Sequence, residues 1–294
     1  MKKSQGEKIF QFFNVIIMIG LCIVMLYPLW HIFMASISDP VRIYADRGFY
    51  LLPKGKTSLQ GYRLVFENPN IVTGMLTTLL YVFAGTILCM VVTIMGAYVL
   101  SRKNLYWNRL ITKLIVFTMY FQGGLIPFFI LVKNLGLLNS HWAVILPFVL
   151  NTWNLIVLRT AFAGMPQSLI DSAQIDGASQ WRILWQIVVP VSRATVAVIA
   201  LFYGVRFWNE WFNPSIFLMD KEKYPLQLVL REILLKNNTN SMTQIGQVGQ
   251  MGQEKFRMLV KYCTIIVSTV PILTIYPFIQ KYFVSGVMIG SLKE

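Results

Sequence analysis

Residues 9–34 have the sequence IFQFFNVIIMIGLCIVMLYPLWHIFM, an apolar run that contains no Lys, Arg, Asp or Glu. The hydrocarbon core of a bilayer is about 30 Å thick, and a helix needs roughly 20 apolar residues to cross it. A secretory signal also begins with basic residues, here Lys2 and Lys3, but its apolar region spans only about 7–15 residues. The run therefore predicts an uncleaved first transmembrane helix.

Five further apolar blocks follow along the chain. They cover approximately residues 71–100, 110–132, 142–163, 183–212 and 259–282. The block that starts at Ile183 is longer than a span requires, so we expect its beginning to lie at the membrane surface. The pattern predicts an all-α integral membrane protein with about six transmembrane helices, organised as a single membrane domain over residues 1–294.

The composition agrees with a membrane protein and argues against a nucleic-acid-binding one. Hydrophobic residues make up 56% of the chain and charged residues only 13%, whereas soluble domains average about 25% charged residues. The net charge of +14 comes from basic residues scattered between the blocks, which indicates anchoring at lipid headgroups and no nucleic-acid partner. The three cysteines, Cys22, Cys89 and Cys263, lie inside apolar blocks and are interpreted as small buried hydrophobes; no metal site is expected.

The charge of the short connecting segments predicts the orientation. Segment 101–109 carries Arg102, Lys103 and Arg109, and Arg159, Arg182 and Arg193 lie close to the ends of the following blocks. Basic residues in short segments near the ends of spans mark the cytoplasmic side. Both termini are then cytoplasmic. The long polar segment 213–257 lies outside, with a helix expected around residues 226–235. Proline and glycine within several blocks indicate kinked helices, and as a set they are compatible with a transport path.

The segment 168–181, SLIDSAQIDGASQW, has the pattern of a helix, a glycine corner and a second helix. Ser168 and Asp171 have the spacing of a capping box, Gly177 suits a left-handed helix end, and Ser179 can cap the next helix. Small residues offer another protein a close approach to the backbone: Ser172, Ala173, Gly177 and Ala178. Spacing alone leaves two interpretations open, a docking knob for a partner and a plain connector.

The same stretch resembles the EAA loop of the permease subunits of ATP-binding-cassette importers. The matching residues are Asp171-Ser172-Ala173, Asp176-Gly177-Ala178, Ile187 and Pro190. The resemblance implies that residues 164–182 form a coupling loop, whose helix sits in a cleft of cytoplasmic ATPase subunits. Two positions depart from the family pattern: the family's glutamate is Asp171, one methylene shorter, and a second proline is replaced by Ala194.

Further segments resemble the carbohydrate-importing, maltose-permease-like group, especially its polysaccharide-utilisation branch. They are residues 121–142, 224–231 and 280–293. The resemblance implies a bacterial plasma-membrane importer with a second homologous permease subunit, two ATPase subunits, an extracellular solute-binding protein and a sugar or oligosaccharide cargo. The chain has no G-x-x-x-x-G-K-[ST] loop, so we expect no cofactor in it and no catalysis by it, with ATP and Mg²⁺ bound by the partners.

Two polar-aromatic clusters at membrane depth are candidates for the cargo path. One contains Asn151, Trp153 and Asn154; the other contains Trp208, Asn209 and Glu210. Sugar sites combine aromatic faces with a few polar groups on apolar walls. The alternatives are an aromatic belt for the tryptophans and an ion pair between Arg206 and Glu210, which are four residues apart.

Each alternative function would need its own signature in the sequence. An importer of the same superfamily for a peptide or amino acid stays open as the alternative. A membrane enzyme would need a nucleophile, base or metal cluster, and His31 and His141 are far apart in the sequence. A secondary transporter would show paired intramembrane acids and no coupling loop.

Overall fold

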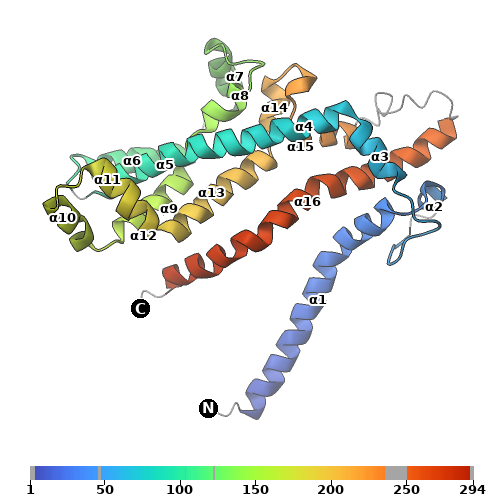
Figure 1. Cartoon of the computed structure of the whole chain (residues 1–294), viewed down its shortest axis with the longest axis horizontal. Coiled ribbons are helices and arrows are strands. Elements are labelled where there is room, and N and C mark those ends of the chain that lie inside the picture. Colours follow the sequence, from blue (N-terminus) through green and yellow to red (C-terminus); the bar gives the residue numbers. More distant parts are fainter. Residues whose placement is uncertain (1–3, 46–47, 103, 122, 236–249, 292–294) are drawn as a thin grey trace. The chain divides into compact units, whose positions relative to one another are not determined.

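The computed structural model describes residues 4–45, 48–102, 104–121, 123–235 and 250–291 (Figure 1). Over these ranges the chain consists of helices and their connections, without a β-strand. Its internal contacts divide it into two compact units. The first unit combines residues 1–69 with 232–270, and the second combines residues 70–231 with 271–294. The single domain expected from the sequence stays a prediction.

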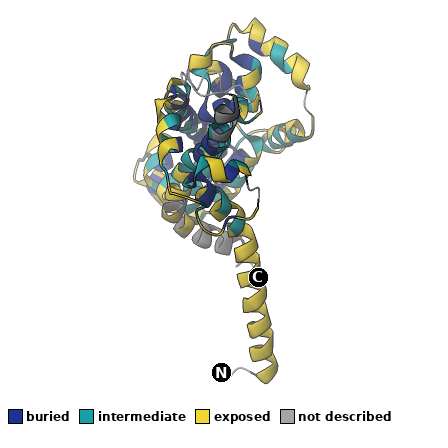
Figure 2. Cartoon of the chain, turned by 90° about the vertical axis from the view of Figure 1, so that its right-hand side faces the viewer, coloured by how far each residue is buried: buried dark blue, intermediate teal, exposed yellow. Residues whose placement is uncertain are grey.

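The first unit is built on a long helix that the chain itself hardly covers. Its elements are α1 (Gln5–Ser36), α2 (Pro40–Ala45), α3 (Gln60–Glu67) and the N-terminal part of α16 (Gln250–Ser291). Nearly all of α1 is exposed (Figure 2), and its mean hydropathy reaches 2.5. Only its C-terminal end is packed, where Met34 and Ala35 lie against Tyr50 and Tyr262. An apolar helix that its own chain leaves uncovered requires lipid or another protein around it.

The second unit contains most of the helices. Its first part is α4 (Pro69–Leu80), a π-helix (Tyr81–Gly85), α5 (Thr86–Ser101), α6 (Asn108–Tyr120), α7 (Leu125–Asn134), α8 (Trp142–Ile145), a 3₁₀ turn (Leu146–Phe148) and α9 (Thr152–Ala163). Its second part is α10 (Gln167–Ile175), α11 (Gln180–Ile183), a π-helix (Leu184–Val188), α12 (Val189–Val191), α13 (Arg193–Trp208), α14 (Phe212–Phe217), a 3₁₀ turn (Lys221–Lys223) and the start of α15 (Leu226–Leu235). The helix expected around residues 226–235 is present as α15.

Helix α5 is the centre of this unit and packs against α9 and α13. Its buried residues Cys89, Ile94 and Ala97 share one core with Leu158 of α9 and Ile199 of α13. At the junction with the π-helix, a side-chain carbon on Gly85 would lie 2.5 Å from the Phe207 ring. The missing side chain of this glycine therefore allows α13 to approach closely, as small residues do between membrane helices.

Within the described residues, the six expected blocks coincide with six candidate spans if each bent pair of helices is counted as one span. Three are helices long and apolar enough to cross a membrane: Gln5–Ser36, Pro69–Ser101 and Phe256–Ile275. The other three are pairs of helices: Asn108–Tyr120 with Leu125–Asn134, Trp142–Phe148 with Thr152–Ala163, and Gln180–Val191 with Arg193–Trp208. The last pair bends by 87° at Ser192, so its first half departs from the direction of α13. Placement of that half on the membrane surface stays a prediction.

Candidate functional site

The segment 164–182 folds as two helices joined by a glycine corner, as its sequence predicts. Gly177 has a φ of +76° and follows α10 directly after its C-cap Asp176. The amide of Ala178 donates to the carbonyl of Ala173 at 2.9 Å, and that of Gly177 donates to Gln174 at 3.0 Å. This pair of hydrogen bonds is the Schellman motif, which satisfies the last carbonyls of a helix.

The start of the second helix is also confirmed, whereas the start of the first is not. The Ser179 side chain accepts from the amide of Arg182 and caps α11. The capping box predicted for Ser168 is wrong, because α10 begins at Gln167 with Pro166 in the cap position. Proline has a φ suited to a helix start and no N–H to satisfy, so the helix starts there without a side-chain cap. Asp171 instead accepts from the Gln167 side chain at 2.9 Å.

The two faces of α10 differ in what they touch. Ile170 and Ala173 are buried in the core shared with α5, so Ala173 lies on the inner face and is not exposed beside Ser172. The expected docking residues on the outer face are Asp171, Ser172, Asp176 and Gly177, which are all exposed, while Ala178 is half-buried. The last member of the motif, Pro190, is exposed in α12, two residues before the bend at Ser192.

The two clusters predicted for the cargo path line one cavity. It has a volume of about 1210 Å³ and is lined by Asn151, Trp153, Asn154, Trp208, Asn209 and Glu210, together with residues of the π-helix, α5, α13 and α16. The clusters are more than fifty residues apart in sequence, and α9 and α13 bring them together across α5. The apolar part of the wall includes Val82, Phe83 and Leu201. A largely apolar wall with a few polar groups is typical of ligand sites.

The ion pair considered between Arg206 and Glu210 is wrong, since each side chain has another partner. Arg206 donates to the carbonyl of Phe148 at 3.2 Å and lies 4.7 Å above that ring. Glu210 accepts two hydrogen bonds of 3.1 Å from Asn213. Helix α13 ends at Trp208, so Glu210 lies beyond the helix and the four-residue spacing no longer places it beside Arg206.

Two polar atoms in the wall of this cavity have no hydrogen-bond partner in the described part of the chain. They are the indole Nε1 of Trp208 and the hydroxyl of Thr86. Trp208 is only 4% exposed, whereas Trp153 is 60% exposed. A buried donor without a partner costs roughly 1–3 kcal/mol. Both atoms are themselves buried, so a ligand could bond to either of them only after the wall rearranges.

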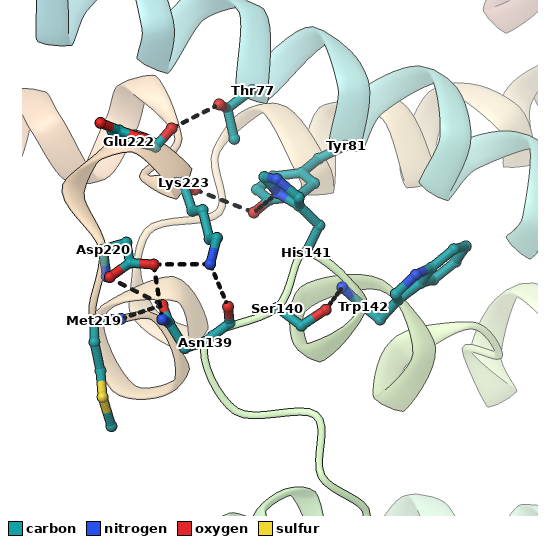
Figure 3. Close-up of polar contacts among 10 residues, drawn as sticks. All are labelled: Thr77, Tyr81, Asn139, Ser140, His141, Trp142, Met219, Asp220, Glu222 and Lys223. Carbon is teal, nitrogen blue, oxygen red and sulfur yellow. Dashed lines mark hydrogen bonds and ion pairs between the residues drawn. The ribbon is translucent and has the colours of Figure 1, made fainter.

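A second polar cluster, which the sequence does not indicate, joins the α7–α8 connection to the segment after α14 (Figure 3). Asn139, whose φ is +56°, accepts from the amides of Met219 and Asp220 and donates to the Asp220 carboxylate. Lys223 donates to that carboxylate and to the carbonyl of Asn139, both at 2.8 Å. We call these three residues, Asn139, Asp220 and Lys223, the loop clasp. No local spacing predicts it, because its two halves are about eighty residues apart.

The loop clasp is hydrogen-bonded to the π-helix Tyr81–Gly85. The Tyr81 hydroxyl donates to the carbonyl of Lys223 at 3.2 Å and lies 3.0 Å from Nδ1 of His141. Burial, and then the charge of Lys223, lower the pKa of His141. Hydrogen bonds from Lys223 and Asn139 lower the pKa of Asp220. The environment therefore favours an ionised Asp220 carboxylate in the clasp and a neutral His141 imidazole beside it.

The sequence of this chain matches a transport family and two bacterial relatives. Residues 93–289 match the family described as binding-protein-dependent transport system inner membrane component. Protein LplC of Bacillus subtilis is 33% identical over 293 residues, which is 100% of this chain and 98% of that protein. The polygalacturonan/rhamnogalacturonan transport system permease protein YtcP of the same organism is 38% identical over 268 residues, 90% of this chain and 92% of that protein.

A solved structure is similar as well. It is the crystal structure of a bacterial ABC transporter involved in the import of the acidic polysaccharide alginate. A chain of that transporter matches with a TM-score of 0.87 and 29% identity, over 96% of this chain and 99% of that chain. This chain is thus an all-α integral membrane protein, and it belongs to the family of binding-protein-dependent transport system inner membrane components.

Proposed function

We propose that this chain is a non-catalytic permease subunit of an ATP-driven importer, and that its cargo is a sugar or oligosaccharide. The observation that carries the proposal is the single cavity in which both predicted polar-aromatic clusters meet. Its volume of about 1210 Å³ exceeds the roughly 300–1,000 Å³ of ordinary small-ligand pockets. The names of the relatives support a saccharide: polygalacturonan and rhamnogalacturonan for one, alginate for another. A peptide or amino-acid cargo is not favoured.

The chemistry of the cavity suits a polyhydroxylated ligand. Trp153 offers an exposed aromatic face, and the carboxylate of Glu210 and the amides of Asn151 and Asn209 can bond hydroxyls. Asn151, Trp153, Asn154, Trp208, Asn209 and Glu210 are accordingly the proposed cargo contacts.

The proposed link to ATP hydrolysis is the exposed face of the 164–182 segment. Leu169 and Ile175 are 44% and 86% exposed there, beside the carboxylates of Asp171 and Asp176. Within the second unit, this segment lies at the end of α5 (Figure 1), where Tyr98 bonds Gln180. The loop clasp lies beside the π-helix that precedes α5, where Tyr81 bonds Lys223. Tyr98, which contacts the segment, and Tyr81, which contacts the loop clasp, are 17 residues apart in sequence, or about 25 Å along a helix. That separation is close to the thickness of the hydrocarbon core.

In this arrangement the 164–182 segment and both termini are cytoplasmic and the loop clasp is outside. The partners are a second homologous permease, two ATPase subunits that bind ATP and Mg²⁺, and an extracellular solute-binding protein. Closure of the ATPases on the coupling loop switches the permease pair between inward-open and outward-open states, a rigid-body change between two packings.

Replacement of Gly177 by proline tests the coupling loop. Proline fixes φ near −65°, which is incompatible with the observed +76°, and it removes the N–H bonded to Gln174. Gly136→Pro is a matched control, because Gly136 has a φ of +68° and its amide also donates three residues back, to Lys133. We expect Gly177→Pro, and not Gly136→Pro, to abolish co-purification of the ATPase subunits with the membrane-inserted chain. Equal capture by both variants would disprove the coupling loop.

Uptake measurements test the cargo contacts. Probes are oligogalacturonides and maltooligosaccharides of two to four units, supplied to cells that express the complete importer. Glu210→Gln should lower uptake of the transported probe by about tenfold, the loss expected from one or two hydrogen bonds. Trp153→Phe should also lower it, because the exposed aromatic face in the cavity becomes smaller. Trp142→Phe serves as control, since Trp142 is 51% exposed and does not line the cavity. Unchanged uptake in both cavity variants would remove these residues from the path.

A further inference from the structure

Helix α5 touches the coupling loop at one point and the cavity at another, through buried hydroxyl groups. We propose that Tyr98 and Tyr203 are positioning residues that carry the state of the coupling loop to the cavity wall through α5. This inference rests on the proposed function of the 164–182 segment. It concerns two tyrosines outside both the coupling motif and the cargo contacts.

The contact with the coupling loop is the hydroxyl of Tyr98. It donates to Oε1 of Gln180 at 2.6 Å, and these residues are 82 positions apart in the chain. Gln180 is the first residue of α11, directly after the cap Ser179. The Tyr98 ring is held in place by the Arg102 guanidinium, whose Cζ is 4.1 Å from the ring centroid. A displacement of α11 therefore acts on α5 through a short, oriented bond.

This end of α5 is fixed to its neighbours as well. The carbonyl of Leu100 accepts from Nε of Arg159 in α9 at 3.0 Å and from the side chain of Asn108 in α6 at 3.2 Å. Ile170 and Ala173 of α10 belong to the same core as the buried face of α5. Because a close-packed core does not deform gradually, α5 moves as a unit with the segment that it contacts.

The contact with the cavity is the hydroxyl of Tyr203 in α13. It lies 2.8 Å from Oγ1 of Thr93 in α5, and it accepts from the amide of Asn151 at 3.0 Å. Tyr203 and Thr93 are both 0% exposed. Thr93 is five residues from Tyr98, or about 7.5 Å along the helix. One rigid segment of α5 thus bears both contacts.

Asn151 carries the connection into the cavity wall. It is the N-cap of α9, and its side chain accepts from the amide of Asn154 at 3.0 Å. The bend of 47° in the fourth span lies next to it, between Phe148 and Thr152. The Tyr203 hydroxyl is thus bonded to the backbone at the start of α9, next to Asn151, Trp153 and Asn154 in the cavity wall.

The test measures whether ATP hydrolysis still rearranges the cavity when these hydroxyls are removed. The reporter is Trp153→Cys in a chain with Cys22→Ser, because Cys89 and Cys263 are buried and Cys22 is exposed. The complex is purified from the source cells through a tag on this chain. Its labelling by a fluorescent maleimide is compared without nucleotide and after trapping with Mg-ATP and vanadate, so no cargo has to be known.

With the native tyrosines, we expect trapping to change the labelling rate. Tyr98→Phe and Tyr203→Phe should each reduce this change by about 3-fold or more, within the range of measured coupling effects, while ATPase capture stays normal. The double variant should lose little more than either single variant, because both act on one connection. Tyr81→Phe is the matched control: its hydroxyl is also buried and bonded but does not face the coupling loop.

Thr93 gives the same test without a change of tyrosine. Thr93→Val removes the hydroxyl and should reduce the response, and Thr93→Ser keeps the hydroxyl and should restore it. The inference is overturned if the tyrosine variants respond like the native chain, if Tyr81→Phe is equally impaired, or if trapping has no effect in the native background. Failure of the proposed function would differ, since the ATPase subunits would then not be captured by the native chain or would still be captured after Gly177→Pro.

Discussion

The closeness of α5 and α13 at Gly85 allows a quantitative test of the packing around the cavity. A side-chain carbon at Gly85 would lie 2.5 Å from Cζ and 2.6 Å from Cε2 of Phe207, and Phe207 is 1% exposed. Gly85 has helical backbone angles, so Gly85→Ala gains about 1 kcal/mol of helix propensity. Overpacking costs typically 1–3 kcal/mol. The difference is a net destabilisation of up to about 2 kcal/mol.

Two other glycines calibrate this value within the same helices. Alanine at Gly96 would meet only Leu155, at 3.1 Å, and alanine at Gly204 would meet only Thr86, at 3.8 Å. Gly204→Ala should therefore keep the full gain in helix propensity, about 1 kcal/mol in the free energy of unfolding. The effect of Gly96→Ala on this free energy should lie between those of Gly204→Ala and Gly85→Ala. The assay is thermal unfolding of the purified membrane protein in detergent, with each variant prepared in parallel.

We expect the midpoint of thermal unfolding to be highest for Gly204→Ala, intermediate for Gly96→Ala and lowest for Gly85→Ala. Phe207→Leu combined with Gly85→Ala should recover part of the loss, because the smaller side chain makes room for the new methyl group. If Gly85→Ala melted as high as Gly204→Ala, the close contact between α5 and α13 would be wrong. The cavity wall that depends on this contact would then need revision.

Two further predictions concern the loop clasp and the neighbouring His141. Asn139→Gly keeps the positive φ but removes the side chain that bonds Met219 and Asp220, so hydrogen exchange of residues 218–224 should rise. Asn139→Asp keeps the acceptor but places a second carboxylate beside Asp220, so it should not restore the protection. Burial and the charge of Lys223 lower the pKa of His141 from 6.5. As the pH falls, His141 is therefore protonated in the unfolded chain at a higher pH than in the folded chain, so the stability of the folded chain should fall as the pH drops below about 6.5. His141→Gln should flatten this decline in thermal midpoints measured between pH 7.5 and 5, and an unchanged pH dependence would contradict the role of His141.

Much of the fold follows from residues close together in the sequence. The six apolar blocks match the candidate spans, because the length and polarity of a helix in a bilayer depend on its own composition. The corner at Gly177 and the cap at Ser179 form as predicted, since both depend on residues at most five positions away. The start of α10 was missed for a local reason, because Pro166 fits the helix start better than Ser168 does.

The sequence by itself determined the membrane class, the spans and the form of the 164–182 segment, and its motif identified the family. Only the tertiary structure decided that residues 151–154 and 208–210 line one cavity, that Arg206 turns to Phe148 and not to Glu210, and that Tyr203 joins α5 to α9. The physical reason is that hydropathy and capping act within a few residues. Contacts between helices depend instead on the rotation of each helix about its axis and on the positions of its breaks. The close packing of α5, α9 and α13 determines both, and this packing exists only in the folded chain.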